Sequence, residues 1–283
     1  MTCAKAGAVK DAAVVPANPL IPVPEFGFDL ILLLIFAALV AGFMDSIAGG
    51  GGLIVIPALL IAGFSPVEAL GTNKLQGLFG SGSATIAFAA KGHVDLKSQL
   101  PSALLAFAGA VLGAALATIL PGDLLRGVMP FLLVAIALYF IFKPNLDDVD
   151  RASRITPFAF GVVVPPLIGF YDGVFGPGAG SFFMLAFVAL AGYGVLKATA
   201  HTKLLNFASN CGGFIAFAIA GVVVWKIGLL MGLAQFVGAR FGAYLAMRTG
   251  ARIIKPLLIT VSLVLAVRLL LDENNPLRAF IGM

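Results

Sequence analysis

Two lysines stand in short polar stretches between long apolar segments, a setting in which a charged side chain is costly to place. Lys74 lies in GTNKLQG at 71–77, and Lys203 lies in AHTKLLN at 200–206. A lysine at the start of a helix adds a full positive charge to the free N–H groups and the dipole there. If symmetry brought two such helix ends together, they would form a binding site for an anion.

The residues beside each lysine are suited to begin a helix. Thr72 or Asn73 in the first stretch, and Thr202 in the second, are preferred N-cap types. Polar residues then recur every four positions, which places them on one helix face. The predicted substrate-binding residues of this group are Thr72, Asn73, Lys74, Gln76, His201, Thr202, Lys203, Asn206 and Asn210, and the stripe also includes Gly77 and Ser81. Alternatively, the lysines extend to lipid headgroups and the stripe only joins helices.

Each polar stretch follows a glycine-rich run, GFMDSIAGGGG at 42–52 or GFYDGVFGPGAG at 169–180. Neither run has the strand-loop-helix context, or the following Gly-Lys-Ser/Thr, of a phosphate loop. At membrane depth, a chain leaves helical geometry only where its backbone is buried in protein or faces water. Glycine allows such geometry and lets a solute approach the backbone closely. The glycines predicted to contact substrate are Gly49, Gly50, Gly51, Gly176, Gly178 and Gly180. Close helix packing is the alternative role.

Three further charged residues lie in or beside apolar segments. Asp45 and Asp172 come just before the glycines, where a carboxylate would relay a proton, pair with Lys74 or Lys203, or cap a helix. Arg240 lies inside an apolar segment with no acidic residue nearby, so we predict that it faces the bundle interior as an accessory anion contact.

The composition identifies an integral membrane protein. Of the 283 residues, 60% are hydrophobic and only 11% are charged, against about 25% charged in soluble domains. The net charge of +5 is scattered, which gives no support to nucleic-acid binding. With two cysteines and two distant histidines, the sequence suggests no metal or cofactor. It also lacks GxSxG and HExxH signatures, so we do not expect an enzyme.

The apolar segments divide into five before and five after the linker KPNLDDVDRASR. We predict an all-α polytopic membrane protein, because a spanning helix needs about 20 apolar residues. The two segments that follow the glycine runs are short enough to span only half the membrane or to re-enter. The predicted segments are 28–45, 52–63, 73–90, 100–119, 125–142, 156–173, 181–192, 203–220, 227–247 and 253–271.

The two halves repeat each other. At an offset of 129 residues (203 − 74), Lys74-Leu75 matches Lys203-Leu204, and the glycine pair 109 and 113 matches 238 and 242. Five crossings per half would make the repeats inverted, whereas four would make them parallel. The predicted organisation is a tail at 1–27, a first repeat at 28–142, a linker at 143–155, a second repeat at 156–271 and a tail at 272–283.

The distribution of positive charge predicts the topology. With ten crossings, nine lysines and arginines fall on one side and five on the other. By the positive-inside rule, the central linker is cytoplasmic and both termini are outside.

These motifs resemble the TauE/SafE family of sulfite exporters, also called 4-toluene sulfonate uptake permeases. The resemblance covers about residues 28–271 and depends on the first glycine run, the GTNK junction and their degenerate second copies. The second copy departs from the first by Pro177 and by His201-Thr202 in place of Thr72-Asn73. The two half-sites are therefore unequal.

The resemblance implies a secondary transporter, expected to be an exporter, for a small sulfur-containing anion such as sulfite or an organosulfonate. It would work in the inner membrane by alternating access, with the lipid bilayer and a small anion as partners, and a homo-oligomer is compatible with the sequence. The alternatives are an anion channel with the same site, and a membrane-embedded enzyme or assembly subunit.

Overall fold

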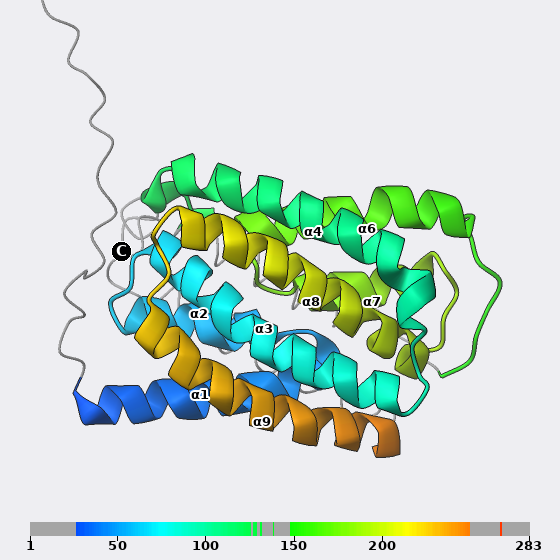
Figure 1. Ribbon diagram of the computed structural model, residues 1–283, viewed down its shortest axis with the longest axis horizontal. Helices are drawn as coiled ribbons and strands as arrows, with labels where there is room; N and C mark the ends of the chain where they lie inside the picture. Colours follow the sequence, from blue (N-terminus) through cyan, green and yellow to red (C-terminus); the bar gives the residue numbers. More distant parts are fainter. Residues whose placement is uncertain are drawn as a thin grey trace, which may run out of the picture.

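A computed structural model describes residues 27–125, 127–128, 131, 138, 148–249 and 267. These residues contain helices and no strand, so the all-α prediction is confirmed. The helices are α1 (Phe28–Ala48), α2 (Gly51–Ile61), α3 (Pro66–Ala90), α4 (Leu96–Ile119), α6 (Pro157–Val174), α7 (Ala179–Ala189), α8 (Val195–Ile219) and α9 (Trp225–Thr249), arranged as Figure 1 shows. The predicted segments 125–142 and 253–271 fall almost wholly outside the described residues.

Two of the predicted segments start about two turns later than their helices do. The helix predicted at 73–90 begins at Pro66, and the one predicted at 203–220 begins at Val195. Ser65 and Glu68 form a capping box in which the Glu68 N–H donates to the Ser65 hydroxyl and the Ser65 N–H donates to the Glu68 carboxylate. Pro66 then occupies the first helical turn, where proline is favoured.

Short helices follow both glycine runs, as predicted. Helices α2 and α7 each contain 11 residues, which corresponds to about 16 Å of helix at 1.5 Å per residue. This is roughly half the 30 Å hydrocarbon thickness of a bilayer. In Figure 1, α2 folds back beside α1, and α7 folds back beside α6 from the opposite end of the bundle. Each repeat thus begins with a helical hairpin whose glycine turn is buried in the bundle.

The central helices α3 and α8 run antiparallel, which is the arrangement that inverted repeats require. Gly77 of α3 approaches Asn210 of α8, and Lys74, one turn earlier in α3, approaches Gly213, nearly one turn later in α8. Both helices contain 25 residues and bury most of their polar side chains. They form the interior of the bundle, crossing near its middle (Figure 1).

The fourth helix of each half packs on the other half. Helix α4 packs on α6 and α8, and α9 packs on α1 and α3. The predicted glycine pairs make these contacts close. A Cβ on Gly113 would collide with the Phe170 carbonyl of α6, and one on Gly242 would collide with the Phe43 carbonyl of α1. These contacts join the two halves into one bundle.

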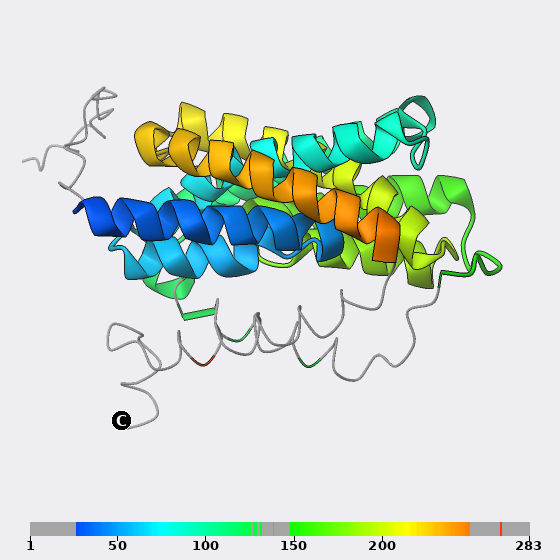
Figure 2. The ribbon, with the colours of Figure 1, turned by 90° about the horizontal axis from the view of Figure 1, so that it is seen from below.

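The outer helices present apolar side chains to the surroundings. Within the part of the chain that the structure describes, α1, α4, α6 and α9 are each long and apolar enough to cross a membrane. Leu112 on α4, Leu167 on α6 and Phe241 on α9 are more than 60% exposed, a pattern that fits contact with lipid. Figure 2 shows α1 and α9 lying side by side along one side of the bundle.

The end of the central linker caps α8, whose own N-cap, Gly194, has no side chain. The Gly194 N–H donates to Asp150 at 2.7 Å, and the Leu196 N–H donates to Asp148 at 2.7 Å. The Gly194 N–H, together with the Lys197 ammonium, lowers the pKa of Asp150. Because the folded state favours the charged carboxylate, this cap stabilises α8 above the ordinary pKa of aspartate and is lost as the pH falls through the lowered value.

Candidate functional site

Two buried ion pairs join the repeats crosswise. Lys74 on α3 places its Nζ 2.6 Å from Asp172 Oδ1 on α6, and Lys203 on α8 places its Nζ 3.9 Å from Asp45 Oδ2 on α1. Both lysine side chains are completely buried. Each pair therefore links one repeat to the other, and together the four side chains carry no net charge.

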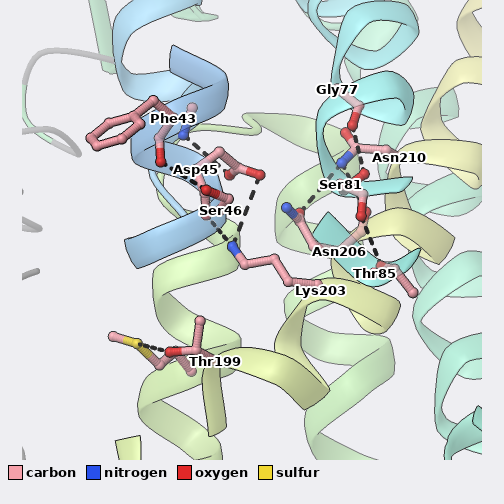
Figure 3. Close-up of polar contacts among 12 residues, drawn as sticks. Phe43, Asp45, Ser46, Gly77, Ser81, Thr85, Thr199, Lys203, Asn206 and Asn210 are labelled. Carbon is pink, nitrogen blue, oxygen red and sulfur yellow. Dashed lines mark hydrogen bonds and ion pairs between the residues drawn. The ribbon is translucent and has the colours of Figure 1, made fainter. Parts of the chain in front are cut away.

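The two pairs differ in their surroundings. Asp172 also accepts a hydrogen bond of 2.6 Å from the Ser209 hydroxyl. Asp45 accepts one of 3.2 Å from the Gly51 N–H, at the first residue of α2. Lys203 donates its hydrogen bond to the main-chain carbonyl of Asp45 and stays further from the carboxylate (Figure 3). Asp172 is therefore the more tightly held of the two carboxylates.

A small polar cavity lies between these pairs, at the crossing of the two repeats. It offers about 20 Å³ in which a water-sized sphere can be centred, which is room for one or two water molecules. A solute larger than this would need the surrounding helices to move apart. The cavity is lined by Asp45, Gly49, Gly52, Asn73, Gly77, Asp172, Gly176, Gly180, Asn206, Asn210 and Gln235.

Four amide side chains give the cavity its donors and acceptors. Asn73 of α3 accepts a hydrogen bond of 3.2 Å from Gln76. Asn210 of α8 donates to the main-chain carbonyl of Asn206 at 2.8 Å, and it fills the space left by Gly77. Figure 3 shows Asn206 and Asn210 reaching from α8 toward Gly77 and Ser81 of α3. A fourth amide, Gln235, comes from α9.

The helix N-termini beside this cavity are not those that the sequence predicted. Thr72, Asn73 and Lys74 lie about two turns inside α3, and Thr202 and Lys203 lie likewise inside α8, so none of them is at a helix end. Instead, α2 begins at Gly51 and α7 at Ala179, each directly after its glycine run. The positive ends of these short helices adjoin the cavity.

The two glycine turns touch each other. Gly49 and Gly178 adopt left-handed backbone angles, each with φ of 78°. A Cβ on Gly180 would lie 2.6 Å from the Gly49 carbonyl oxygen, a distance that real Cβ atoms do not reach. Glycine is therefore required where the tips of the two hairpins meet.

The cavity brings together eight of the predicted residues. These are Asp45, Gly49, Asn73, Asp172, Gly176, Gly180, Asn206 and Asn210. Lys74 and Lys203 lie behind it and pair with its two carboxylates. Gly50, Gly51 and Gly178 belong to the two hairpin turns, and Gln76 bonds to Asn73.

Four predicted residues lie elsewhere. Thr72 accepts a hydrogen bond from the Val224 N–H, which joins α3 to the start of α9. Thr202 is buried outside the cavity lining, and His201 packs its ring against Tyr193 and Phe187. Arg240 is exposed on α9, so the prediction that it faces the bundle interior is wrong. The small residues Gly238, Ala239 and Gly242 occupy the packed face of α9, which leaves no space there for arginine.

The sequence prediction missed Gln235 and Gly52. Gln235 is the only amide of α9 and matches Ala106 at the repeat offset (235 − 129), so the repeat gave no signal for it. Its burial, at 3% exposure within an apolar segment, could have been suspected from the rule that buried polar groups are functional in membranes.

We expect Gln235→Leu to weaken the binding of a solute in the cavity about tenfold, because the loss of one hydrogen bond costs about 1.4 kcal/mol. The Gln235 carbonyl oxygen has no hydrogen-bond partner in the described structure, so the melting temperature without ligand should hardly change. Calorimetric binding of sulfoacetate to the purified variant measures the first effect, and thermal unfolding measures the second. Unchanged affinity would remove Gln235 from the site.

Comparison with known proteins identifies the family of this chain. The family model described as "Sulfite exporter TauE/SafE" matches residues 34–269. The chain belongs to the TauE/SafE family. It is 65% identical to "Probable membrane transporter protein ORF9" of a Sinorhizobium species, over 91% of this chain and 99% of that protein. No solved structure matches it.

More distant TauE/SafE relatives have similar descriptions. The chain is 46% identical to "Probable membrane transporter protein YfcA" of Escherichia coli strain K12, over 87% of this chain and 91% of that protein. It is 42% identical to a "Probable membrane transporter protein" of Haemophilus influenzae, over 88% and 98% of the two chains. This protein is therefore a multi-pass membrane transporter of that family.

Proposed function

We propose that this transporter carries a small sulfur-containing anion, such as sulfite or an organosulfonate, out of the cell across the inner membrane. The observation that carries the proposal is the polar cavity at the crossing of α3 and α8, lined by four amides and flanked by two buried lysines. The several oxygens of a sulfite or sulfonate group suit amide and N–H donors together with positive charge. The description of the matching family model, a sulfite exporter, supports the same substrate class.

Alternating access is the mechanism that the inverted arrangement favours. The two hairpins enter from opposite ends of the bundle and meet at Gly49 and Gly180, so each repeat contributes one wall of the cavity. Transporters built from inverted repeats bind substrate at such interfaces and rock one element against the other. The small volume of the cavity fits a closed state, from which movement of either hairpin would admit substrate from one side.

Exchange across a vesicle membrane tests the proposal. The purified protein is reconstituted into liposomes loaded with unlabelled sulfite or sulfoacetate, and uptake of the labelled anion from a dilute outside solution is followed. With the membrane potential clamped near zero by potassium and valinomycin, a carrier still accumulates label transiently as it exchanges one anion for another, whereas a channel only lets the label equilibrate. Accumulation with the sulfur anions, but not with acetate, is the expected result. Equal uptake with empty vesicles would instead favour a channel.

A further inference from the structure

We infer that Asp45 takes up a proton when the site binds an anion, whereas Asp172 stays ionised and holds the repeats together. The inference rests on the proposed function and adds the coupling ion to it: each anion would move together with a proton bound on Asp45.

The charge balance of the site requires a compensating charge for a bound anion. Two lysines and two aspartates lie at or beside the cavity, and each lysine faces an aspartate of the other repeat. Among the described residues that line the cavity, Asp45 and Asp172 are the charged ones, and the rest are amides and glycines. A monovalent anion would leave this buried region with one uncompensated negative charge, which is strongly unfavourable in a low-dielectric interior. A proton that arrives with the anion restores neutrality.

The two carboxylates differ in how tightly their charged forms are held. Asp172 has its lysine at 2.6 Å and the Ser209 hydroxyl at 2.6 Å, so protonation would disrupt two short contacts to its charged form. Asp45 has its lysine at 3.9 Å and a longer bond of 3.2 Å from the Gly51 N–H. Protonation of Asp45 therefore disrupts less.

The position of Lys203 does not depend on the charge of the Asp45 carboxylate. Its Nζ donates to the main-chain carbonyl of Asp45, an interaction that remains when the carboxylate becomes neutral (Figure 3). Protonation converts the Asp45 carboxylate to a carboxylic acid, with no other bond formed or broken. Lys203 then keeps its place, but its positive charge is no longer compensated, and the carboxyl group gains an O–H that donates to an oxyanion.

The groups that face Asp45 from the neighbouring helices agree with this assignment. Helix α8 contributes Lys203, and α3 contributes Lys74, whose charge interacts with Asp45 through space. Helix α2 contributes the Gly51 N–H, and α9 contributes the neutral Gln235 on the same cavity wall. These groups favour an anion near Asp45 once the carboxylate has lost its charge.

Proton uptake on binding tests the inference in the wild-type protein. Methanesulfonate and ethanesulfonate are suitable probes, because each carries a single negative charge that does not change between about pH 6 and pH 8. We expect their affinity to weaken by up to about tenfold per pH unit, as linkage to one proton requires. A pH-indicator dye in weak buffer should register the uptake of up to one proton per methanesulfonate bound.

Matched variants identify the residue. Asp45→Asn mimics the protonated form, so its affinity should be independent of pH and should equal that of the wild type at low pH. Asp172→Asn, if it folds, should bind with the same pH slope as the wild type, whatever its affinity.

If the wild type binds either probe with no pH slope and no proton uptake, the inference falls and the proposed function stands. A slope that persists in Asp45→Asn overturns the assignment to Asp45. If neither probe binds at any pH, the proposed function fails and the inference with it.

Discussion

Lys74→Ala is expected to destabilise the protein by about 3–5 kcal/mol, because it leaves the Asp172 carboxylate charged and without its cation in the interior. Lys74 is completely buried, and its Nζ lies 2.6 Å from the Asp172 carboxylate. Thermal unfolding in detergent measures the effect. Lys197→Ala is the matched control, since Lys197 pairs with Asp150 at a similar distance of 2.8 Å but with both side chains about half exposed. Such a pair contributes at most about 1 kcal/mol.

A double variant separates the structural role of Lys74 from its role in binding. Lys74→Met with Asp172→Asn removes both charges at once, so no unpaired charge remains and the stability should largely return. Transport should not return, because the positive charge behind the cavity is gone. A double variant that is both stable and fully active would show that the pair only holds α3 against α6.

Gly49→Ala is expected to abolish transport and to lower stability by more than the strain of its backbone. Gly49 has φ of 78°, and a Cβ there would also lie 2.6 Å from the Ser181 N–H nitrogen and would press into Gly180. An alanine in a left-handed conformation costs about 1–2 kcal/mol by itself. The collision adds to that cost and would force the tips of the two hairpins apart at the cavity. Vesicle transport and thermal unfolding measure the two effects.

Substitutions at two other glycines test the backbone strain and the collision between the hairpins separately. Gly63→Ala introduces strain alone, because Gly63 has φ of 93° and a Cβ there would meet nothing within 4 Å. Gly180→Ala introduces the collision alone, since Gly180 has no left-handed angle and its Cβ would lie 2.6 Å from the Gly49 oxygen. We expect Gly63→Ala to transport normally and Gly180→Ala to fail. Normal transport by Gly180→Ala would contradict the contact between the hairpins.

Much of this fold could be predicted from the sequence because the physical signals are strong. A hydrophobic content of 60% in long runs identifies membrane helices, and two glycine runs followed by short apolar segments predict the hairpins that α1–α2 and α6–α7 form. The repeat between Lys74 and Lys203 identified α3 and α8 as equivalent helices. The repeat alone did not predict that α3 and α8 are antiparallel. The direction of each helix depends on how many times the preceding chain crosses the membrane.

The errors have particular physical causes. Thr72 and Thr202 are good N-cap types, but Ser65 with Glu68, and the linker aspartates with Gly194, cap the helices earlier. The crosswise pairing of Lys74 with Asp172 depends on tertiary contact between α3 and α6, so spacing along the chain could not select it over pairing within a repeat. Arg240 lies on the outer face because the glycines of α9 are used to approach α1. The predicted repeat boundaries, topology, oligomeric state and substrate stay predictions.

The most direct test of a central anion site is a thermal-shift screen of the purified protein against sulfite, sulfate, thiosulfate, sulfoacetate, taurine and acetate. A ligand that binds only the folded protein stabilises it by about 2.7 kcal/mol at a hundredfold excess over its dissociation constant. We expect a sulfur-containing anion to raise the melting temperature of the wild type, and the rise to disappear in the double variant of Lys74 and Asp172. No stabilisation by any of these anions, or the same rise in the double variant, would contradict an anion site between the two repeats.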